Sequence, residues 1–224
     1  MLYLLLLPTI SAASAKAPLA PWEFKRRALK PNDVLVEILF SGICHSDIHQ
    51  ARYLSISSLS SLSSSLTSLS SSLSASLSAL LSLLLSSSNY REEWGQANFP
   101  MVPGHEIIGN VKEVGSAVTK FSVGEKAGVG VYVDSCRTCA NCLLKESNYC
   151  LEGMTGTYNA KERDGSGITQ GGYSNCIVVN EDYVLRVPEN LDSAGAAPLL
   201  CAGITLYSPL KHWGAGPGKK VSHH

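Results

Sequence analysis

The stretch Gly42-Ile43-Cys44-His45-Ser46-Asp47-Ile48-His49 decides how the rest of this 224-residue chain is interpreted. It places a thiol, a hydroxyl and two imidazoles within six residues, which is dense for an ordinary hydrophobic core. Residues 33–39, directly upstream, alternate and are rich in β-branched side chains, which predicts a strand. Cys44 is therefore expected just past a strand end, where a rigid scaffold can present metal ligands.

Three further residues complete a possible metal-binding set with Cys44. His105 and Glu106 supply an imidazole and a carboxylate before the strand-like run of residues 107–118, and Cys201 supplies a second thiol. Taken alone, each has an ordinary explanation, because a lone buried cysteine behaves as a small hydrophobe and a lone loop histidine is often only hydrogen-bonded. Together, two thiolates, one imidazole and an open position form the ligand set of a catalytic zinc.

A second cysteine cluster gives the most specific local signal in the chain. Its four members lie within 15 residues, at Cys136, Cys139, Cys142 and Cys150. Four thiolates can close a tetrahedral shell around one zinc, which organises a loop by metal binding and leaves no open position. An iron–sulfur cluster is the chemical alternative. We favour structural zinc, since the other ligands also form a zinc-type set.

Charge and cysteine usage narrow the class of protein. The chain has 18 basic and 18 acidic residues, so its formal net charge of zero gives no reason to expect a nucleic-acid partner. Six of its seven cysteines belong to the two metal sets, and Cys176 is expected in the core of an apolar strand. This usage favours a reducing, cytoplasmic compartment over a disulfide framework.

The N-terminus supports an alternative location. Residues 1–7 are apolar, and residues 13–15 resemble the cleavage site of a secretory leader. However, no Lys or Arg precedes the apolar run, and the run is far shorter than the roughly 20 residues that cross a bilayer. We therefore treat residues 1–15 as an apolar leader of uncertain status.

Residues 55–88 differ in composition from the rest of the chain. These 34 residues contain 19 serines and 11 leucines and no charged residue. The leucines recur at helical spacing, so an amphipathic helix that docks on a membrane or a partner is one interpretation. We favour a low-complexity insertion without a fold of its own, because serine is a middling helix former and no basic residue could hold a lipid headgroup.

The remaining pattern predicts a β-rich, barrel-like domain. Short strands separated by glycine turns are expected over residues 111–118, 127–133, 173–179 and 183–187. From residue 193 to residue 210 the pattern becomes Ala-rich and helical, with Cys201 on the new element.

Four motifs together resemble the zinc-dependent medium-chain alcohol dehydrogenases, above all the cinnamyl-alcohol-dehydrogenase-like, NADP-dependent aldehyde reductases. They are Gly-Ile-Cys-His-Ser-Asp-Ile-His at 42–49, Pro-Gly-His-Glu at 103–106, the cysteine cluster and Pro-Leu-Leu-Cys-Ala-Gly-Ile-Thr at 198–205. The resemblance covers about residues 16–54 and 90–221. It implies a GroES-like β-barrel catalytic domain with a structural zinc lobe, and a C-terminal helix that leads to a Rossmann coenzyme domain.

The resemblance also implies roles for individual residues. Cys44, His105 and Cys201 would hold the catalytic zinc, with Glu106 beside it. Ser46 and His49 would relay a proton, and His45 would contact the coenzyme phosphate. The four clustered cysteines would hold the structural zinc. For Trp94, a place in the substrate pocket wall and a packed loop aromatic are equally good interpretations.

The resemblance therefore implies an oxidoreductase that transfers hydride between NADP(H) and a small primary alcohol or aldehyde, and that could form a homodimer. We expect a catalytic domain over residues 16–192, interrupted at 55–88, and the start of the coenzyme-domain linkage over residues 193–224. The glycines of residues 214–218 imitate a dinucleotide fingerprint, but they precede the strand that such a loop should follow. We therefore expect this chain alone to be inactive; a non-catalytic zinc-binding protein and a membrane- or partner-binding protein are the alternatives.

Overall fold

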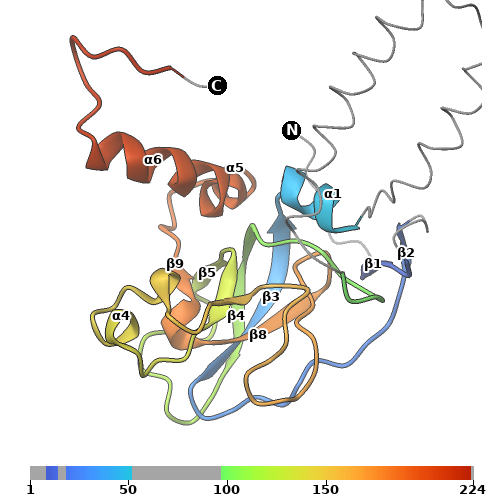
Figure 1. Cartoon of the computed structure of the whole chain (residues 1–224). Helices are drawn as coiled ribbons and strands as arrows, with labels where there is room; N and C mark the ends of the chain where they lie inside the picture. Colours follow the sequence, from blue (N-terminus) through green and yellow to red (C-terminus); the bar gives the residue numbers. More distant parts are fainter. Residues whose placement is uncertain (1–8, 15–18, 52–96, 223–224) are drawn as a thin grey trace, which may run out of the picture.

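The computed structural model describes residues 9–14, 19–51 and 97–222 (Figure 1). Residues 55–88 and Trp94 lie outside the described residues, so their interpretations stay predictions. Within the expected N-terminal leader, strand β1 (Ile10–Ala12) pairs antiparallel with β2 (Leu19–Pro21).

An antiparallel five-stranded sheet forms the centre of the fold, in the order β8–β3–β4–β5–β9. Its strands are β3 (Asp33–Ser41), β4 (Ile107–Val114), β5 (Lys126–Val129), β8 (Cys176–Asn180) and β9 (Leu185–Arg186). The strand predicted at residues 33–39 is confirmed, and β3 continues to Ser41. The β-rich fold class is likewise confirmed.

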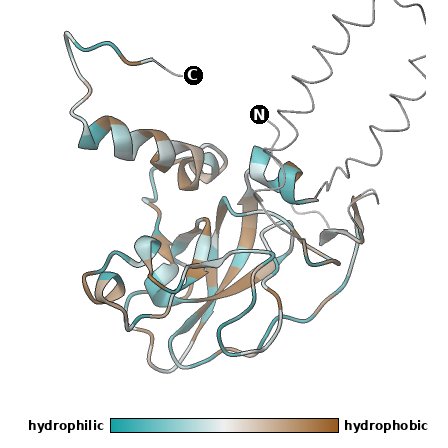
Figure 2. Cartoon of the chain, viewed as in Figure 1, coloured by the Kyte–Doolittle hydropathy of each residue, from teal (hydrophilic) through white to brown (hydrophobic). Residues whose placement is uncertain are grey.

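Both faces of the sheet are covered by other parts of the chain. Alternate residues of β3 point into the main core, where Val34 and Val36 are fully buried beside Ile107 of β4. Because neighbouring side chains on a strand point to opposite faces, Ile108 packs instead against Ala196 and its neighbours on the far side. These strands appear as the hydrophobic centre of the molecule in Figure 2.

Two predicted strands are shorter or broken in the structure. The run expected over residues 127–133 is interrupted after β5, and its second half, β6 (Tyr132–Asp134), pairs with β7 (Thr155–Gly156) in a separate sheet. The strand expected at residues 183–187 shrinks to β9, because a 3₁₀ turn (Glu181–Tyr183) occupies its start. Asn180 caps that turn by accepting the N–H of Asp182.

The four-cysteine lobe, residues 136–150, projects beside β6. It contains the single-turn helix α4 (Ala140–Leu143) and a 3₁₀ turn (Ser147–Tyr149). Its large apolar side chains point mostly outward, and Leu143 and Leu144 are 69% and 70% exposed. The lobe therefore has little hydrophobic core of its own.

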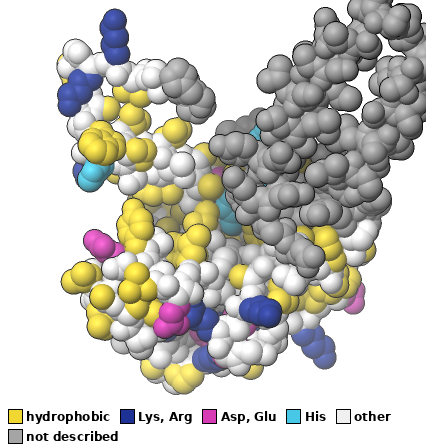
Figure 3. Space-filling model, in the orientation of Figure 1, with side chains coloured by type: hydrophobic (Ala, Val, Ile, Leu, Met, Phe, Trp, Pro, Cys, Tyr) yellow, Lys and Arg dark blue, Asp and Glu magenta, His cyan; other side chains and the backbone are white. Residues whose placement is uncertain are grey.

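The predicted C-terminal helix is present but divided. It consists of α5 (Ser193–Ala196), a 3₁₀ turn (Ala197–Leu200) and α6 (Ala202–His212), and Cys201 lies at the last junction. Helix α6 stands away from the sheet in Figure 1, and apolar side chains cover part of its surface in Figure 3. In the described part of the chain no single helix could cross a membrane; only these segments together, bent by 60°, have the length and composition.

Candidate metal centres

The first candidate centre lies where three distant segments of the chain meet. Cys44 follows the end of β3 and directly precedes α1 (His45–Ala51). His105 and Glu106 directly precede β4, and the backbone N–H of Gly42 donates to the carbonyl of Glu106, with 2.9 Å between nitrogen and oxygen. Cys201 arrives from the other end of the chain, at the start of α6.

These segments bring four metal-binding side chains together. One donor atom from each of the sequence-predicted ligands lies within 4.8 Å of all the others: Cys44, His105, Glu106 and Cys201. The side chains of His105 and Glu106 are buried, and both thiols are partly accessible. The cluster is therefore less deeply buried at its two cysteines than at His105 and Glu106.

The donor set fits a tetrahedral zinc ion. The sulfur atoms of Cys44 and Cys201 lie 3.9 Å apart and both thiols are free. That separation is far longer than a disulfide bond of about 2.05 Å. Two sulfurs that each lie about 2.3 Å from a tetrahedral zinc would be separated by roughly 3.8 Å.

Asp47 organises this centre, a role that sequence reasoning did not assign. Its Oδ1 accepts hydrogen bonds from the backbone N–H of Gly104 and from Nδ1 of His105, at 2.9 and 3.1 Å. Its Oδ2 accepts from the backbone N–H of Cys44 at 2.9 Å and from the hydroxyl of Tyr173 at 3.1 Å. The side chain is only 3% exposed, so these donors replace its water.

The hydrogen bond from Nδ1 of His105 to Asp47 also determines which nitrogen of His105 is free. Burial opposes ionisation of Asp47, but His105 and the backbone N–H groups outweigh burial and hold its pKa below the ordinary value. An ionised carboxylate can only accept, so Nδ1 of His105 must carry the proton. The lone pair of Nε2 is then available to a metal, as in other carboxylate–histidine–metal arrangements.

The two thiols differ in acidity in the metal-free protein. Burial opposes ionisation of Cys44, but hydrogen bonds from Ser46 and the charge of His105 outweigh it and hold the pKa below the ordinary value. Burial and the neighbouring Cys44 raise the pKa of Cys201 to about 12. Burial also raises the pKa of Glu106. A bound cation would relieve the repulsion between these groups.

Helix α1 carries the other residues for which the sequence predicted roles. The Ser46 hydroxyl lies 3.5 Å from the sulfur of Cys44. His45 and His49 are exposed, with their ring centres 5.5 Å apart. The ring centre of Tyr158 lies 5.7 Å from that of His105.

The second candidate centre gathers the four cysteines of the lobe, whose sulfur atoms lie within 4.8 Å of one another: Cys136, Cys139, Cys142 and Cys150. The sulfurs of Cys136 and Cys142 are 3.8 Å apart, again the edge expected for a tetrahedral metal site. The backbone N–H groups of Cys136, Cys139 and Leu151 point at sulfur atoms, at 3.3–3.4 Å. Such hydrogen bonds stabilise thiolates.

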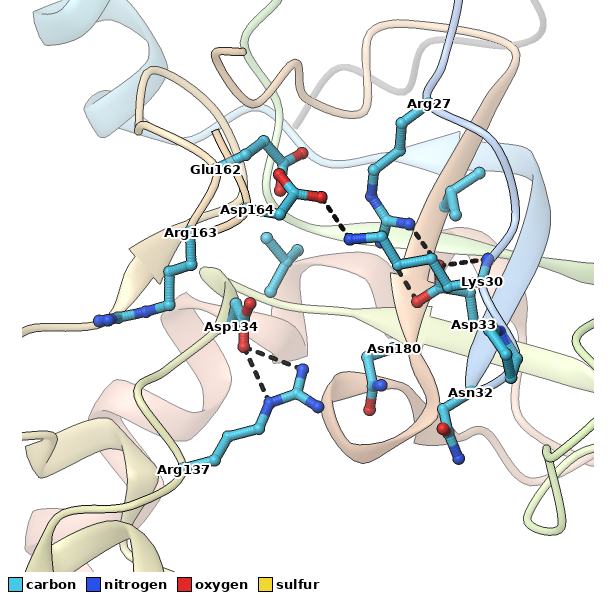
Figure 4. Close-up of a pocket in the computed structure, with 13 residues that line it drawn as sticks. Arg27, Lys30, Asn32, Asp33, Asp134, Arg137, Glu162, Arg163, Asp164 and Asn180 are labelled. Carbon is cyan, nitrogen blue, oxygen red and sulfur yellow. Dashed lines mark hydrogen bonds and ion pairs between the residues drawn. The ribbon is translucent and has the colours of Figure 1, made fainter. Parts of the chain in front are cut away.

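A polar pocket of about 470 Å³ lies apart from both clusters (Figure 4). Charged side chains of both signs line it, and most of them form ion pairs with one another, namely Arg27 with Asp33, Lys30 with Asp164 and Arg137 with Asp134. None of the residues that line it belongs to a candidate metal set. The pocket therefore lacks the residues that we expect to bind a metal, and its size alone does not mark it as an active site.

Comparison with known proteins agrees with the fold and the motifs. A model of the alcohol dehydrogenase GroES-like domain matches residues 83–189. Among solved structures, a cinnamyl alcohol dehydrogenase from Sorghum bicolor is 38% identical, with a TM-score of 0.73 over 94% of this chain and 49% of the other. A cinnamyl alcohol dehydrogenase from Helicobacter pylori, solved with NADP(H), is 37% identical with the same TM-score over 95% of this chain and 50% of the other. Residues 83–189 thus match the alcohol dehydrogenase GroES-like domain, and the chain is similar to cinnamyl alcohol dehydrogenases, in agreement with the resemblance that its motifs predicted.

Curated relatives are similar over the same region. NADP-dependent alcohol dehydrogenase C 1 of Mycolicibacterium smegmatis is 49% identical over 95% of this chain and 50% of its own length. Aldehyde reductase YahK of Escherichia coli is 45% identical over the same shares. The chain thus spans about half the length of these relatives.

Proposed function

We propose that this chain supplies the zinc-binding catalytic half of an NADP(H)-linked alcohol dehydrogenase that interconverts primary alcohols and aldehydes. The observation that carries the proposal is the convergence of Cys44, His105, Glu106 and Cys201 within 4.8 Å. The names of the relatives support the reaction class, since they include NADP-dependent alcohol dehydrogenases and an aldehyde reductase.

Cys44, His105 and Cys201 would hold a zinc ion, with the carboxylate of Glu106 beside it as a nearby oxygen donor. Bound there, zinc supplies a Lewis acid that polarises the oxygen of an alcohol or aldehyde. Asp47 keeps the imidazole of His105 in the tautomer that leaves Nε2 free. Because Cys44 and Cys201 remain partly accessible, a small substrate can approach from the sulfur side.

Ser46 and His49 would move the proton that the reaction exchanges. The Ser46 hydroxyl lies beside the donor cluster, 3.5 Å from the Cys44 sulfur, so it can donate to the substrate oxygen or accept from it. His49 is one helical turn further along α1 and exposed, which suits exchange with water. His45, also exposed, would contact the coenzyme phosphate.

The cluster of residues 136–150 would hold a second, structural zinc. Its four thiolates complete a tetrahedral shell, so no position is left for substrate. The seven free thiols also suit a reducing, cytoplasmic setting, which we include in the proposal.

Hydride transfer needs a coenzyme held against the substrate, and such positioning can lower a barrier by roughly 7–11 kcal/mol. The three sheets of the described residues are antiparallel, whereas dinucleotide-binding units are built on parallel strands. We therefore expect the 224 residues alone to bind zinc and to show no NADPH-dependent aldehyde reduction.

The decisive experiment joins the chain, after Val221, to the coenzyme domain of a close relative and assays aldehyde reduction with NADPH. Turnover should appear in this fusion, disappear with Cys44→Ala, and persist with Cys176→Ala as the matched control. Absence of turnover in a folded, zinc-loaded fusion that binds NADPH would contradict the proposed function. So would full turnover in the Cys44→Ala fusion.

A further inference from the structure

Residues 170–174 support the loop that carries His105. Three of its residues donate their backbone N–H groups to the carbonyls of residues 102–104, namely Gly171, Gly172 and Tyr173. The nitrogen–oxygen distances are 2.6–3.0 Å. In return, the backbone N–H of Val102 donates to the side chain of Gln170 at 2.7 Å. Four hydrogen bonds therefore join the two segments.

Two glycines make this close approach possible. A Cβ on Gly171 would lie 2.4 Å from the carbonyl oxygen of Pro103, and one on Gly172 would lie 2.4 Å from the side chain of Ile107. Both distances are far below normal van der Waals contact. Any other residue would push residues 170–174 away from the loop that carries His105.

Arg26 fixes the same segment from its other side. Its guanidinium donates to the carbonyls of Gln170, Gly171 and Cys176, at 2.5–2.9 Å, and to the hydroxyl of Ser174 at 2.7 Å. Arginine keeps its charge in proteins, and these four acceptors replace its water. The segment is thus held rigidly between Arg26 and the loop at residues 102–104.

Tyr173 extends from this rigid segment to the metal centre. Its side chain is 7% exposed, and its ring lies close against Gly104, where a Cβ would come within 2.8 Å of the ring. Its hydroxyl donates to Oδ2 of Asp47 at 3.1 Å. The other hydrogen bonds described above for Asp47 come from Cys44, Gly104 and His105, in the two segments that carry metal ligands.

We propose that Tyr173 is a positioning residue that fixes the rotation of the Asp47 carboxylate and thereby holds Cys44 and His105 in their metal-binding arrangement. The inference rests on the proposed function, because it assumes that this cluster binds a metal. The Tyr173 hydroxyl is a contact through which a separately anchored part of the fold holds Oδ2 of Asp47. Tyr158 is a second tyrosine that interacts with this carboxylate. Without it, Oδ2 keeps the Cys44 N–H and the carboxylate is freer to turn away from His105.

Loss of an outer hydrogen-bond partner of a metal ligand typically lowers metal affinity by about 10–100-fold. Tyr173 acts through Asp47 and not directly on a ligand, so we expect the lower end of this range for Tyr173→Phe. The lobe cluster should not respond, because its sulfur atoms are bonded by a separate set of backbone N–H groups. The inference therefore predicts an effect confined to one of two metal sites.

The test uses the full 224-residue chain, prepared metal-free and titrated with ¹¹³Cd²⁺. Cadmium NMR separates a four-sulfur site from a site with two sulfurs and an imidazole, because the chemical shift depends on the number of thiolates. In Tyr173→Phe, the two-sulfur resonance should shift or broaden and its cadmium affinity should fall about tenfold. The four-sulfur resonance should stay in place. Tyr183→Phe is the matched control: it removes another buried hydroxyl, bonded to Ser135 at 2.6 Å, and should leave the two-sulfur resonance unchanged.

Three other results are possible, and each would contradict a different claim. An unchanged two-sulfur resonance with unchanged affinity in Tyr173→Phe would overturn the role of Tyr173 alone. Loss of both resonances together with the circular dichroism signal would show that the hydroxyl supports the whole fold, which also contradicts a positioning role. A wild-type chain that gives only the four-sulfur resonance would overturn the proposed function, and this inference with it.

Discussion

Glu181 is a buried carboxylate outside both metal centres that holds a loop in place. Its side chain is 6% exposed, and its Oε2 accepts the backbone N–H groups of Thr119 and Lys120 at 2.9 and 2.8 Å. Burial opposes its ionisation, but these hydrogen bonds outweigh burial and hold the pKa below the ordinary value of 4.5. Ionised Glu181 therefore stabilises the folded state.

The sign of the pH dependence follows from the lowered pKa. The stabilisation is complete above the pKa of the unfolded chain and is lost as pH falls through the lower folded-state pKa. Glu181→Gln should therefore reduce the free energy of unfolding by about 1 kcal/mol at pH 7, because charged hydrogen bonds become neutral ones. The difference should shrink below pH 4.

Urea unfolding of the zinc-loaded chain at several pH values measures this effect. Glu189→Gln, at an exposed glutamate, is the matched control and should change stability little at any pH. A Glu181→Gln chain whose deficit stays constant down to pH 3 would refute the assignment of the effect to an ionised carboxylate.

Single-residue roles were predictable from sequence only where residue type and spacing imply chemistry. The four-cysteine spacing and the Cys44, His105 and Cys201 set indicated metal sites, and the structure gathers each set. Asp47 was missed because a buried organising carboxylate looks like any acidic residue in the first turn of a helix. Its hydrogen bond to Tyr173 joins residues 126 apart in sequence, which no local pattern indicates.

Strands β3 and β4 pack so closely that one position requires glycine. A Cβ on Gly109 would lie 2.0 Å from the backbone oxygen of Glu37 and 2.8 Å from the side chain of Val36. Backbone in the middle of a sheet cannot move aside cheaply. Gly109→Ala should destabilise the fold by at least about 1–3 kcal/mol, the usual cost of overpacking.

Thermal and urea unfolding of Gly109→Ala measure this cost against Gly216→Ala. An added Cβ at Gly216 meets no atom within 4 Å, so that variant should unfold like the wild type. Equal stability of the two variants would show that the β3–β4 register in solution differs from the one described here.

The four-cysteine lobe should depend on its metal for order. Its apolar residues face outward, so a metal has to replace the missing hydrophobic core. Cys139→Ser should lose one metal ion and make residues 136–151 sensitive to protease, while the central sheet stays protected. Limited proteolysis with mass spectrometry checks this, with Cys176→Ser as the control outside both clusters. Equal protection of the lobe in both variants would contradict the expectation.

Elements were predictable where their hydrophobic pattern was long and regular, as in β3. The sequence did not reveal the break between β5 and β6, because residues 127–133 look like one apolar run. The division into two sheets comes from tertiary pairing of β6 with β7, which local propensity does not encode. Cys176, expected in the core, is only half-buried because it begins β8.

The described part of the molecule combines a β-sheet, whose core consists of apolar side chains, with two clusters of possible metal ligands. One cluster is closed by four thiolates and lies in a lobe with little core. The other joins segments from residues 44, 105 and 201 at one end of the inner strands β3 and β4, beside the exposed helix α6. A relative about twice as long is 49% identical over 95% of the chain. The proposed function depends on these two clusters.

The zinc content of the folded chain tests this account most directly. Elemental analysis of the purified 224-residue protein should give two zinc ions per chain, one ion in Cys44→Ser, and two in Cys176→Ser. Circular dichroism should show that Cys44→Ser keeps its fold, because Cys44 lies beyond the end of β3 and outside the hydrophobic core. A wild-type chain that holds one zinc or none when folded, or one that holds iron with a visible iron–sulfur absorption spectrum, would contradict the account.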